Sequence, residues 1–174
     1  MAEVFVIGNL IGTLNVTGCY SSCHFSTHIG SNWELLEGHG EGRTQMAKLE
    51  CGTSYWYHPI DLHFVAHTIV DWPKLLLRVF TRDFTDTDGF AAYGVLVLPT
   101  HPGHYELKVP LWRPHGSFKQ RVEATLLGGY PEYDKPEVIL EDSSRSSITA
   151  ISCGEVVVEL NVAHKGFERQ SVQL

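Results

Sequence analysis

The sequence predicts an all-β fold, a single antiparallel β-sandwich of about eight strands with one short helix in a connection. Short apolar runs recur roughly every 10–15 residues, separated by Gly, Pro, Asn and Asp. Aromatic residues make up 11% of the chain, and they favour the half-buried surface of a sheet. Hydrophobic residues make up 43%, enough for a buried core, and 174 residues indicate one domain over 1–174.

The first half of the chain predicts five strands. Their expected ranges are 3–14, 20–29, 33–36, 55–57 and 60–66. A glycine follows the second range, and a polar, Gly-rich stretch follows the third. In the fifth range, Ile60, Leu62 and Phe64 alternate with Asp61 and His63. This period of two indicates a strand with one buried face.

The second half predicts further strands at 75–81, 93–98, 105–109 and 155–162. The run at 75–81 is strongly apolar, which indicates a central strand. In the last range, apolar and polar residues alternate, and Val157 is the exception, an apolar residue at a polar position. Such a pattern of many strands separated by turns is typical of a sandwich.

One segment has helical spacing. Phe118, Val122, Thr125 and Leu126 fall on one helical face within 118–127, Ser117 is a suitable N-cap, and two glycines follow at 128–129. We therefore expect a short helix there. The polar, Ser-rich stretch 134–147 is expected to be an exposed loop around one short strand near 138–140.

Charge and hydropathy exclude several classes of function. The formal net charge of −7, without a basic block, argues against nucleic acid as a partner. No apolar run approaches the roughly 18 residues of a membrane span. The first residues carry Glu3 and no early Lys or Arg, so we interpret them as a strand of a cytoplasmic protein and not as a secretion signal.

Cysteine and histidine are present in numbers that raise the question of metal binding. The four cysteines lack the second close pair of a zinc site, and we expect them to stay reduced. His24 and His28 are four residues apart, as are His63 and His67. On a strand this spacing separates side chains by roughly 13 Å, too far to share one ion. No cofactor is expected.

Motifs for catalysis are missing from the sequence, which lacks a nucleophile elbow, a P-loop, a dinucleotide fingerprint and a zinc-protease motif. We therefore expect a binding protein and not an enzyme. An acidic cluster, Asp83, Asp86 and Asp88, follows the strand at 75–81 and is a weak, incomplete calcium candidate. Asp is also favoured in solvated turns, which is the simpler interpretation.

Aromatic residues are the second candidate feature. Tyr and Trp are favoured at protein interfaces, although each could equally pack in the core or at a sheet edge. The candidates are Trp33, Tyr55, Trp56, Tyr57, Trp72 and Trp112.

Several stretches, taken in order, resemble the B9-domain family over nearly the whole chain. They are MAEVFVIGNLIG, YWYHPIDLHF, WPKLLLRVFTRD, AYGVLVLP, PGHYELKVPLWRPHGS, the glycine pair before a proline, and the closing GFERQ. The resemblance implies a C2-like β-sandwich and a place at the ciliary base, in the basal body and transition zone. It also implies a scaffold role in the Meckel syndrome (tectonic-like) complex, which supports cilium assembly and the ciliary diffusion barrier.

The partners that the resemblance implies are B9 domain-containing protein one and the Meckel syndrome type one protein. The alternative is a C2-like module that binds membrane phospholipid. Calcium-binding C2 domains carry a Val-x-Asp-x-Asp pattern, to which 79–83 corresponds here. Thr81 stands at the first acidic position and only Asp83 matches, which weakens the case for calcium-dependent lipid binding.

Overall fold

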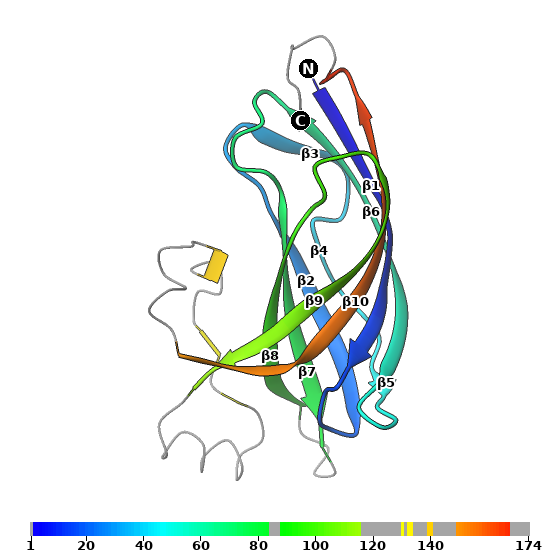
Figure 1. Cartoon of the computed structure of the whole chain (residues 1–174), viewed down its shortest axis with the longest axis vertical. Coiled ribbons are helices and arrows are strands. Elements are labelled where there is room, and N and C mark those ends of the chain that lie inside the picture. Colours follow the sequence, from blue (N-terminus) through cyan, green and yellow to red (C-terminus); the bar gives the residue numbers. More distant parts are fainter. Residues whose placement is uncertain are drawn as a thin grey trace.

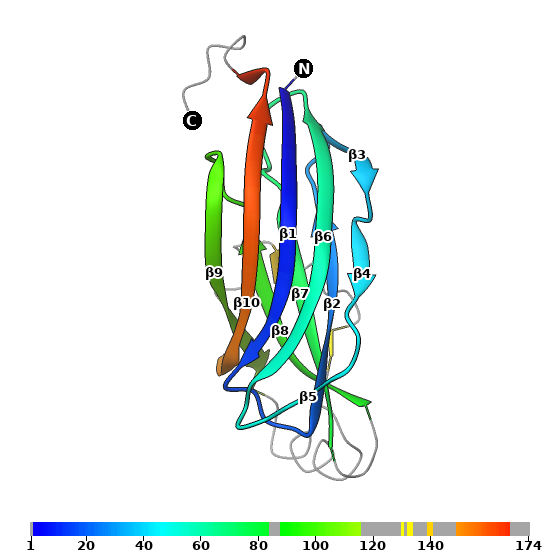
Figure 2. The ribbon, with the colours of Figure 1, turned by 90° about the vertical axis from the view of Figure 1, so that its right-hand side faces the viewer.

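A computed structural model describes residues 2–83, 88–115, 130, 132–133, 139–140 and 149–167 of the chain. Within this part, ten strands form one continuous antiparallel sheet that folds over into two layers (Figures 1 and 2). The strands are β1 (Ala2–Leu14), β2 (Tyr20–His28), β3 (Trp33–Gly38), β4 (Glu41–Arg43), β5 (Ala47–Lys48), β6 (Ser54–Ala66), β7 (Lys74–Arg82), β8 (Asp88–Val97), β9 (Gly103–Pro114) and β10 (Ala150–Lys165). Among the described residues, no helix is long and apolar enough to cross a membrane.

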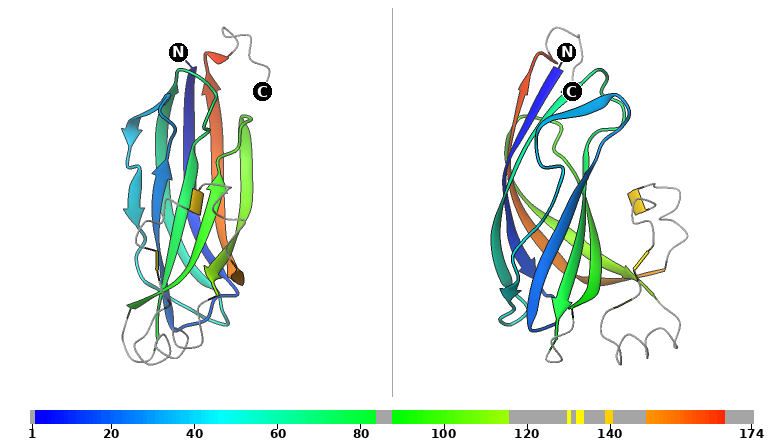
Figure 3. Two further views of the ribbon diagram at one scale, coloured as in Figure 1. Left: turned by 90° about the vertical axis from the view of Figure 1, so that its left-hand side faces the viewer. Right: turned by 180° about the vertical axis from the view of Figure 1, so that it is seen from behind.

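The two layers have a simple strand order. One is β3-β6-β1-β10-β9 and the other is β8-β7-β2-β4, with β5 paired to β2. Figure 3 shows both layers from two further sides. They are joined where β8 meets β9, at the register pair Tyr93–Trp112. The predicted antiparallel sandwich is confirmed; the strand count is higher because β4 and β5, of three and two residues, are too short to show a period.

Alternation along each long strand places one face in the core between the layers. On β6, the residues facing inward are apolar and fully buried, whereas their neighbours on the other face are mostly exposed. The inward residues of β6 and β7 include Trp56, Ile60, Leu62, Phe64, Leu75, Leu77 and Val79. Burying one such side chain contributes about 1.5–3 kcal/mol, so this face holds the two layers together.

A second apolar cluster covers the outer face of β7 and β8. Leu76, Phe90 and Tyr93 pack there against Ile139 and Leu140. The Tyr93 hydroxyl accepts a hydrogen bond of 2.8 Å from the Tyr133 backbone N–H, and burial raises the pKa of Tyr93 to about 12. Because β7 is apolar on both faces, the prediction of a central strand at 75–81 is confirmed.

Two sequence-based expectations differ from the structure. The runs at 55–57 and 60–66 belong to the single strand β6, with Pro59 inside it. Proline is tolerated because β3 pairs only with residues 62–66, so Pro59 lies where β6 has a neighbour on one side alone. The strand expected near 138–140 is wrong, since Ile139 and Leu140 lie in a 3₁₀ turn that packs on β7. The helix expected at 118–127 lies outside the described residues.

Three buried hydroxyls link the two layers near one end of the sandwich. Ser54 of β6 shares hydrogen bonds with Thr13 of the neighbouring β1 (2.8 Å) and with Ser21 of β2 in the other layer (2.5 Å). All three side chains are fully buried. The Trp56 indole N–H donates to the Ser21 carbonyl at 3.1 Å, which adds a second polar connection between the layers.

A register shift interrupts the pairing of β1 with both its neighbours beside Ile11. On β6, the shift places Tyr57 in the left-handed backbone region, with φ 47°. On β1, Gly12 lies so close to β6 that a Cβ there would be 1.8 Å from the Ser54 carbonyl oxygen. The bend therefore depends on glycine at position 12 and fixes the direction in which Tyr57 points.

Candidate functional site

One member of the acidic cluster that the sequence offered as a weak calcium site, Asp88, belongs to an ion-pair network. Arg82 ends β7 and Asp88 begins β8 opposite it. The Arg82 guanidinium donates to both carboxylate oxygens, with Nε–Oδ1 at 2.7 Å and Nη2–Oδ2 at 3.1 Å, and Arg43 Nη2 lies 3.7 Å from Oδ2. The hydrogen bonds from Arg82 lower the pKa of Asp88 below its ordinary value. The guanidinium groups of Arg82 and Arg43 thus interact with the carboxylate that a metal cation would need as a ligand.

The other two carboxylates add no second ligand within the described chain. Asp83 is exposed and Asp86 lies outside the described residues. Over the ranges that the structure describes, no group of three or more His, Cys, Asp or Glu side chains could hold a metal ion. Asp83 and Asp88 alone therefore give no calcium site within the described residues, and the weak candidate that includes Asp86 stays a prediction.

Asp88→Asn is expected to lower stability at neutral pH by less than about 1 kcal/mol, because both partners are partly exposed and screened by water. The folded-state pKa of Asp88 is depressed, so the carboxylate stabilises the fold above its ordinary pKa of 3.8. That contribution is lost as the pH falls through the folded pKa. Urea denaturation at a series of pH values should show the two proteins converging below about pH 4. Asp83→Asn is the matched control; a gap independent of pH would contradict the ion pair.

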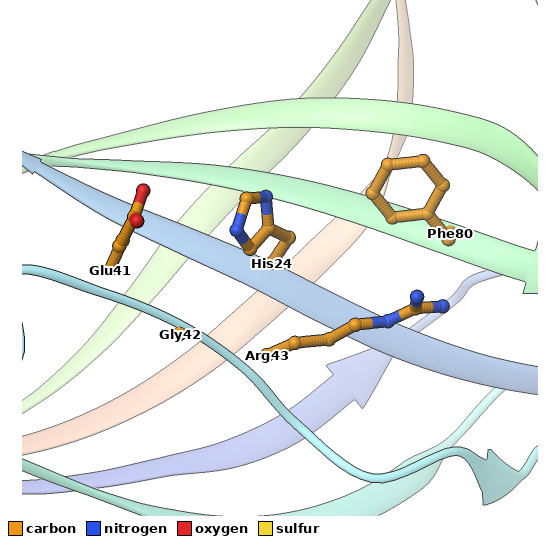
Figure 4. Close-up of a pocket in the computed structure, with 5 residues that line it drawn as sticks. All are labelled: His24, Glu41, Gly42, Arg43 and Phe80. Carbon is orange, nitrogen blue, oxygen red and sulfur yellow. The ribbon is translucent and has the colours of Figure 1, made fainter.

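A shallow pocket of about 370 Å³ lies next to this network on the outer face of β2, β4 and β7. Figure 4 shows Glu41, His24, Arg43 and Phe80 projecting on the same side of these strands, with Gly42 between two of them. The Arg43 guanidinium carbon lies 5.8 Å from the centre of the Phe80 ring, within the range of a cation–π contact.

Charges in and around the pocket balance one another. Arg78 forms an ion pair with Glu132 at 3.1 Å and hydrogen-bonds His24 Nδ1. Burial lowers the pKa of His24, and the positive charge of Arg78 lowers it further, so the neutral ring accepts this hydrogen bond. Since each arginine has an acidic neighbour, the pocket is polar and nearly neutral, which suits contact with a protein better than capture of an anion.

A larger concavity of about 580 Å³ lies at the open side of the sandwich, between β4 and β6. Phe25 lies at its base with the His58 ring 5.6 Å away, and Gly42 leaves room for Phe25, since a Cβ there would be 2.7 Å from its ring. One carbonyl on the nearby edge of β6 has a side-chain partner, because the Gln45 amide donates a hydrogen bond to the Trp56 carbonyl at 2.6 Å. The lining offers histidines and acids but no serine or cysteine nucleophile among the residues that form it.

Six aromatic residues were candidates for an interface, and the structure separates them. Trp33 and Trp56 are buried, while Trp72 and Trp112 are half-buried against the two clusters. Tyr55 and Tyr57 are 61% and 63% exposed. Only this pair, of the six, is therefore available to a partner.

The exposed tyrosines lie side by side on the outer face of β6. Their ring centres are 6.1 Å apart and the ring planes differ by 14°, so the rings stack. On the neighbouring β1, Ile7 is 54% exposed, and Phe5 stacks on His63 with ring centres 4.1 Å apart. Sequence reasoning missed Ile7 and Phe5 because the first strand carries apolar residues on both faces. Their partners on β10 are Asn161 and Ala163, whereas Val157, the apolar exception on that strand, pairs with Gly12 farther along β1.

Cysteine and histidine form no site in this part of the chain. All four cysteines are free, and Cys23 is fully buried, which raises the pKa of its thiol to about 12 and makes it inert. His63 lies between two acids, with Glu3 at 3.3 Å and Glu37 at 4.0 Å. His104 approaches Glu159 at 3.7 Å. His63 is half-buried and His104 is exposed, and both lie in acidic surroundings.

Comparison with known proteins gives consistent results. A family model described as "Ciliary basal body-associated, B9 protein" matches residues 4–163. The chain is 35% identical to B9 domain-containing protein 2 of Bos taurus over 174 residues, covering 99% of both chains, and 34% identical to that of Homo sapiens. It is 27% identical to B9 domain-containing protein 1 of Xenopus laevis, covering 93% of this chain and 89% of the relative.

Among solved structures, the chain is similar to the C2A domain of plant Extended Synaptotagmin 1. The TM-score is 0.45 with 9% identity, covering 94% of this chain and 95% of that one. This score is too low to carry an argument about function. The B9 domain-containing protein 2 chains of Bos taurus and Homo sapiens, by contrast, match over 99% of their length.

Proposed function

Because the chain belongs to the family of ciliary basal body-associated B9 proteins, we propose that it is a non-enzymatic scaffold subunit of the ciliary transition zone. In this role it joins the Meckel syndrome (tectonic-like) complex, which supports cilium assembly and the ciliary diffusion barrier. The observation that carries the proposal is the whole-length match to B9 domain-containing protein 2 at 35% identity.

The surface chemistry supports binding and not catalysis. An active site needs a pocket in which a nucleophile or base and a group that stabilises charge converge. The two concavities described above are open, and the acidic and basic side chains near them pair with one another. The fully buried thiol, Cys23, is held in its unreactive form by its raised pKa. Two stacked, exposed tyrosines on a rigid sheet are instead typical of a protein interface.

The partners proposed are the two other B9 proteins, B9 domain-containing protein one and the Meckel syndrome type one protein. When the three proteins of one organism are co-expressed, we expect a stable complex of defined stoichiometry by size-exclusion chromatography with light scattering. Such a complex requires an interface of at least about 1,000 Å². Three proteins that elute separately at micromolar concentration would contradict direct assembly.

One observation favours phospholipid binding as the second candidate. Ile69 and Val70 are exposed next to each other in the connection between β6 and β7, at one end of the sandwich. Two aliphatic side chains at a tip can enter the membrane interface, but the connecting residues 67–73 contain no Lys or Arg to hold an anionic headgroup.

Flotation with phosphatidylserine-containing liposomes separates the two functions. For a scaffold, the protein should stay in the dense fraction with and without Ca²⁺. Flotation that decreases with salt and is lost in an Ile69→Ser/Val70→Ser variant would favour the lipid module.

A further inference from the structure

An apolar stripe crosses the outer face of the layer that contains β1. It consists of Phe5, Ile7, Ile11, Tyr55, Tyr57 and Val157. None of these residues belongs to the apolar core or packs against it. β1 is the middle strand of its layer, so the stripe lies at the centre of a face and not at an edge (Figure 2).

The strand register divides the stripe into two parts. Ile11 lies in the register shift opposite Trp56 and Tyr57, and Gly12 pairs with Val157 on the other side. Phe5 and Ile7 form the second part on the same face of β1, and Asn9, paired with Glu159 and Pro59, lies between Ile7 and Ile11. A row of large apolar side chains at the centre of a rigid sheet is the usual composition of an interface core.

Tyr57 occupies a backbone conformation that is unfavourable for a residue with a large side chain. Its φ of 47° lies in the left-handed region, which glycine adopts freely and a large side chain adopts at a disadvantage. With 63% of its surface exposed, the ring gains little from core packing in return. Strain at an exposed aromatic side chain is therefore an indication of a role outside the fold.

Charge defines the kind of partner. On the outer face of β6, β9 and β10, the positions around the stripe carry Asp61, Glu106, Glu155 and Glu159 against Lys108, while Lys165 is paired with Glu3. The whole chain has a net charge of −7. A second copy would bring acids against acids, so a complementary surface must come from a different, basic chain.

We propose that the apolar stripe is the docking surface for a different protein whose contact surface presents apolar anchors flanked by Lys or Arg. This inference rests on the proposed function and assigns its binding face. Tyr57 and Tyr55 are the central anchors, and the acidic rim steers the basic partner onto them.

The test uses the complex with B9 domain-containing protein one of the same organism. Tyr57→Gly is expected to weaken binding and to raise the dissociation constant at least about tenfold, because it removes an aromatic side chain from the interface. The same change should leave Tm unchanged or raise it by about 2–4 °C, because glycine relieves the left-handed backbone. A residue with a merely structural role would lower Tm when replaced.

Three further variants, one of them a control, make the result specific. Tyr55→Ser should weaken binding, whereas Tyr20→Ser, which removes a tyrosine that is 42% exposed on β2 in the other layer, should not. Asp61→Asn/Glu159→Gln should slow association and reduce its dependence on salt.

The outcomes separate the two proposals. If the wild-type chain binds and the Tyr57, Tyr55 and acidic-rim variants bind equally well, the docking surface is overturned and the scaffold function stands. If the tyrosine variants weaken binding but salt has no effect on association, the basic partner is overturned. If the wild-type chain binds neither B9 protein, the scaffold function fails and the docking surface fails with it.

Discussion

Gly12→Ala is expected to destabilise the domain by about 3–5 kcal/mol, a large share of the ~5–15 kcal/mol that stabilises a domain. The new Cβ would lie 1.8 Å from the Ser54 carbonyl oxygen and 2.9 Å from its carbon. Both are backbone atoms, so relief requires β1 and β6 to separate. This pair is central to its layer, and its separation also disturbs the buried hydroxyls beside it.

Thermal and urea denaturation should show the loss as a fall in both Tm and the urea midpoint. Gly40→Ala is the matched control, since a Cβ there would lie 3.1 Å from the end of the Leu35 side chain and in ordinary contact with the Thr27 Cβ, at 3.9 Å. We expect that variant to stay within about 1 kcal/mol of wild type. Equal stability of the two variants would contradict the close approach of β1 and β6.

Ser54→Ala is expected to cost about 2–4 kcal/mol, much more than most Ser→Ala changes. The Ser54 hydroxyl is the shared partner of Thr13 and Ser21, and all three are buried away from water. Its removal leaves two buried hydroxyls without this partner, and each such loss costs about 1–3 kcal/mol. One of the lost hydrogen bonds connects the two layers.

Removing the whole network should be less harmful than removing its centre. The triple variant Thr13→Val/Ser21→Ala/Ser54→Ala leaves no hydroxyl of the three behind, so its loss of unfolding free energy should be smaller than the sum of the three single losses. Ser22→Ala is the control: Ser22 is also buried, but its hydroxyl accepts one long hydrogen bond, 3.4 Å from Arg43. Additive losses in the triple variant would show that the three hydroxyls act independently.

The long strands were predictable because their side chains alternate against one buried core. Residues 60–66 show this directly, whereas the apolar run at 75–81 indicated a strand covered on both faces; both ranges lie within strands. Shorter elements depend on tertiary contacts that a local pattern does not contain. β5 has two residues, and Ile139 and Leu140 form a turn because they cover the outer face of β7. Pro59 interrupts the apolar pattern, yet β6 continues through it since one edge is unpaired there.

The candidate surface was only partly visible in the sequence. Tyr55 and Tyr57 were included among six aromatic residues, and burial alone separates them from Trp33 and Trp56. Ile7 lies in a strand that carries apolar residues on both faces, so its exposure depends on which face of β1 packs against the other layer. The ion pair of Asp88 with Arg82 depends on the register of β7 with β8, which has no counterpart in residue spacing.

The position of β1 between β6 and β10 has a consequence for synthesis. β1 leaves the ribosome before the other described strands, yet one of its two neighbours, β10, is the last of them to be made. Until the segment ending at Lys165 has emerged, β1 and β9 each present an unpaired edge to solvent. Exposed edges of this kind make a nascent chain prone to aggregation. Translation that stops before residue 150 leaves this layer open, and under the docking proposal a partner that binds across β1 and β10 recognises only chains in which both strands are present.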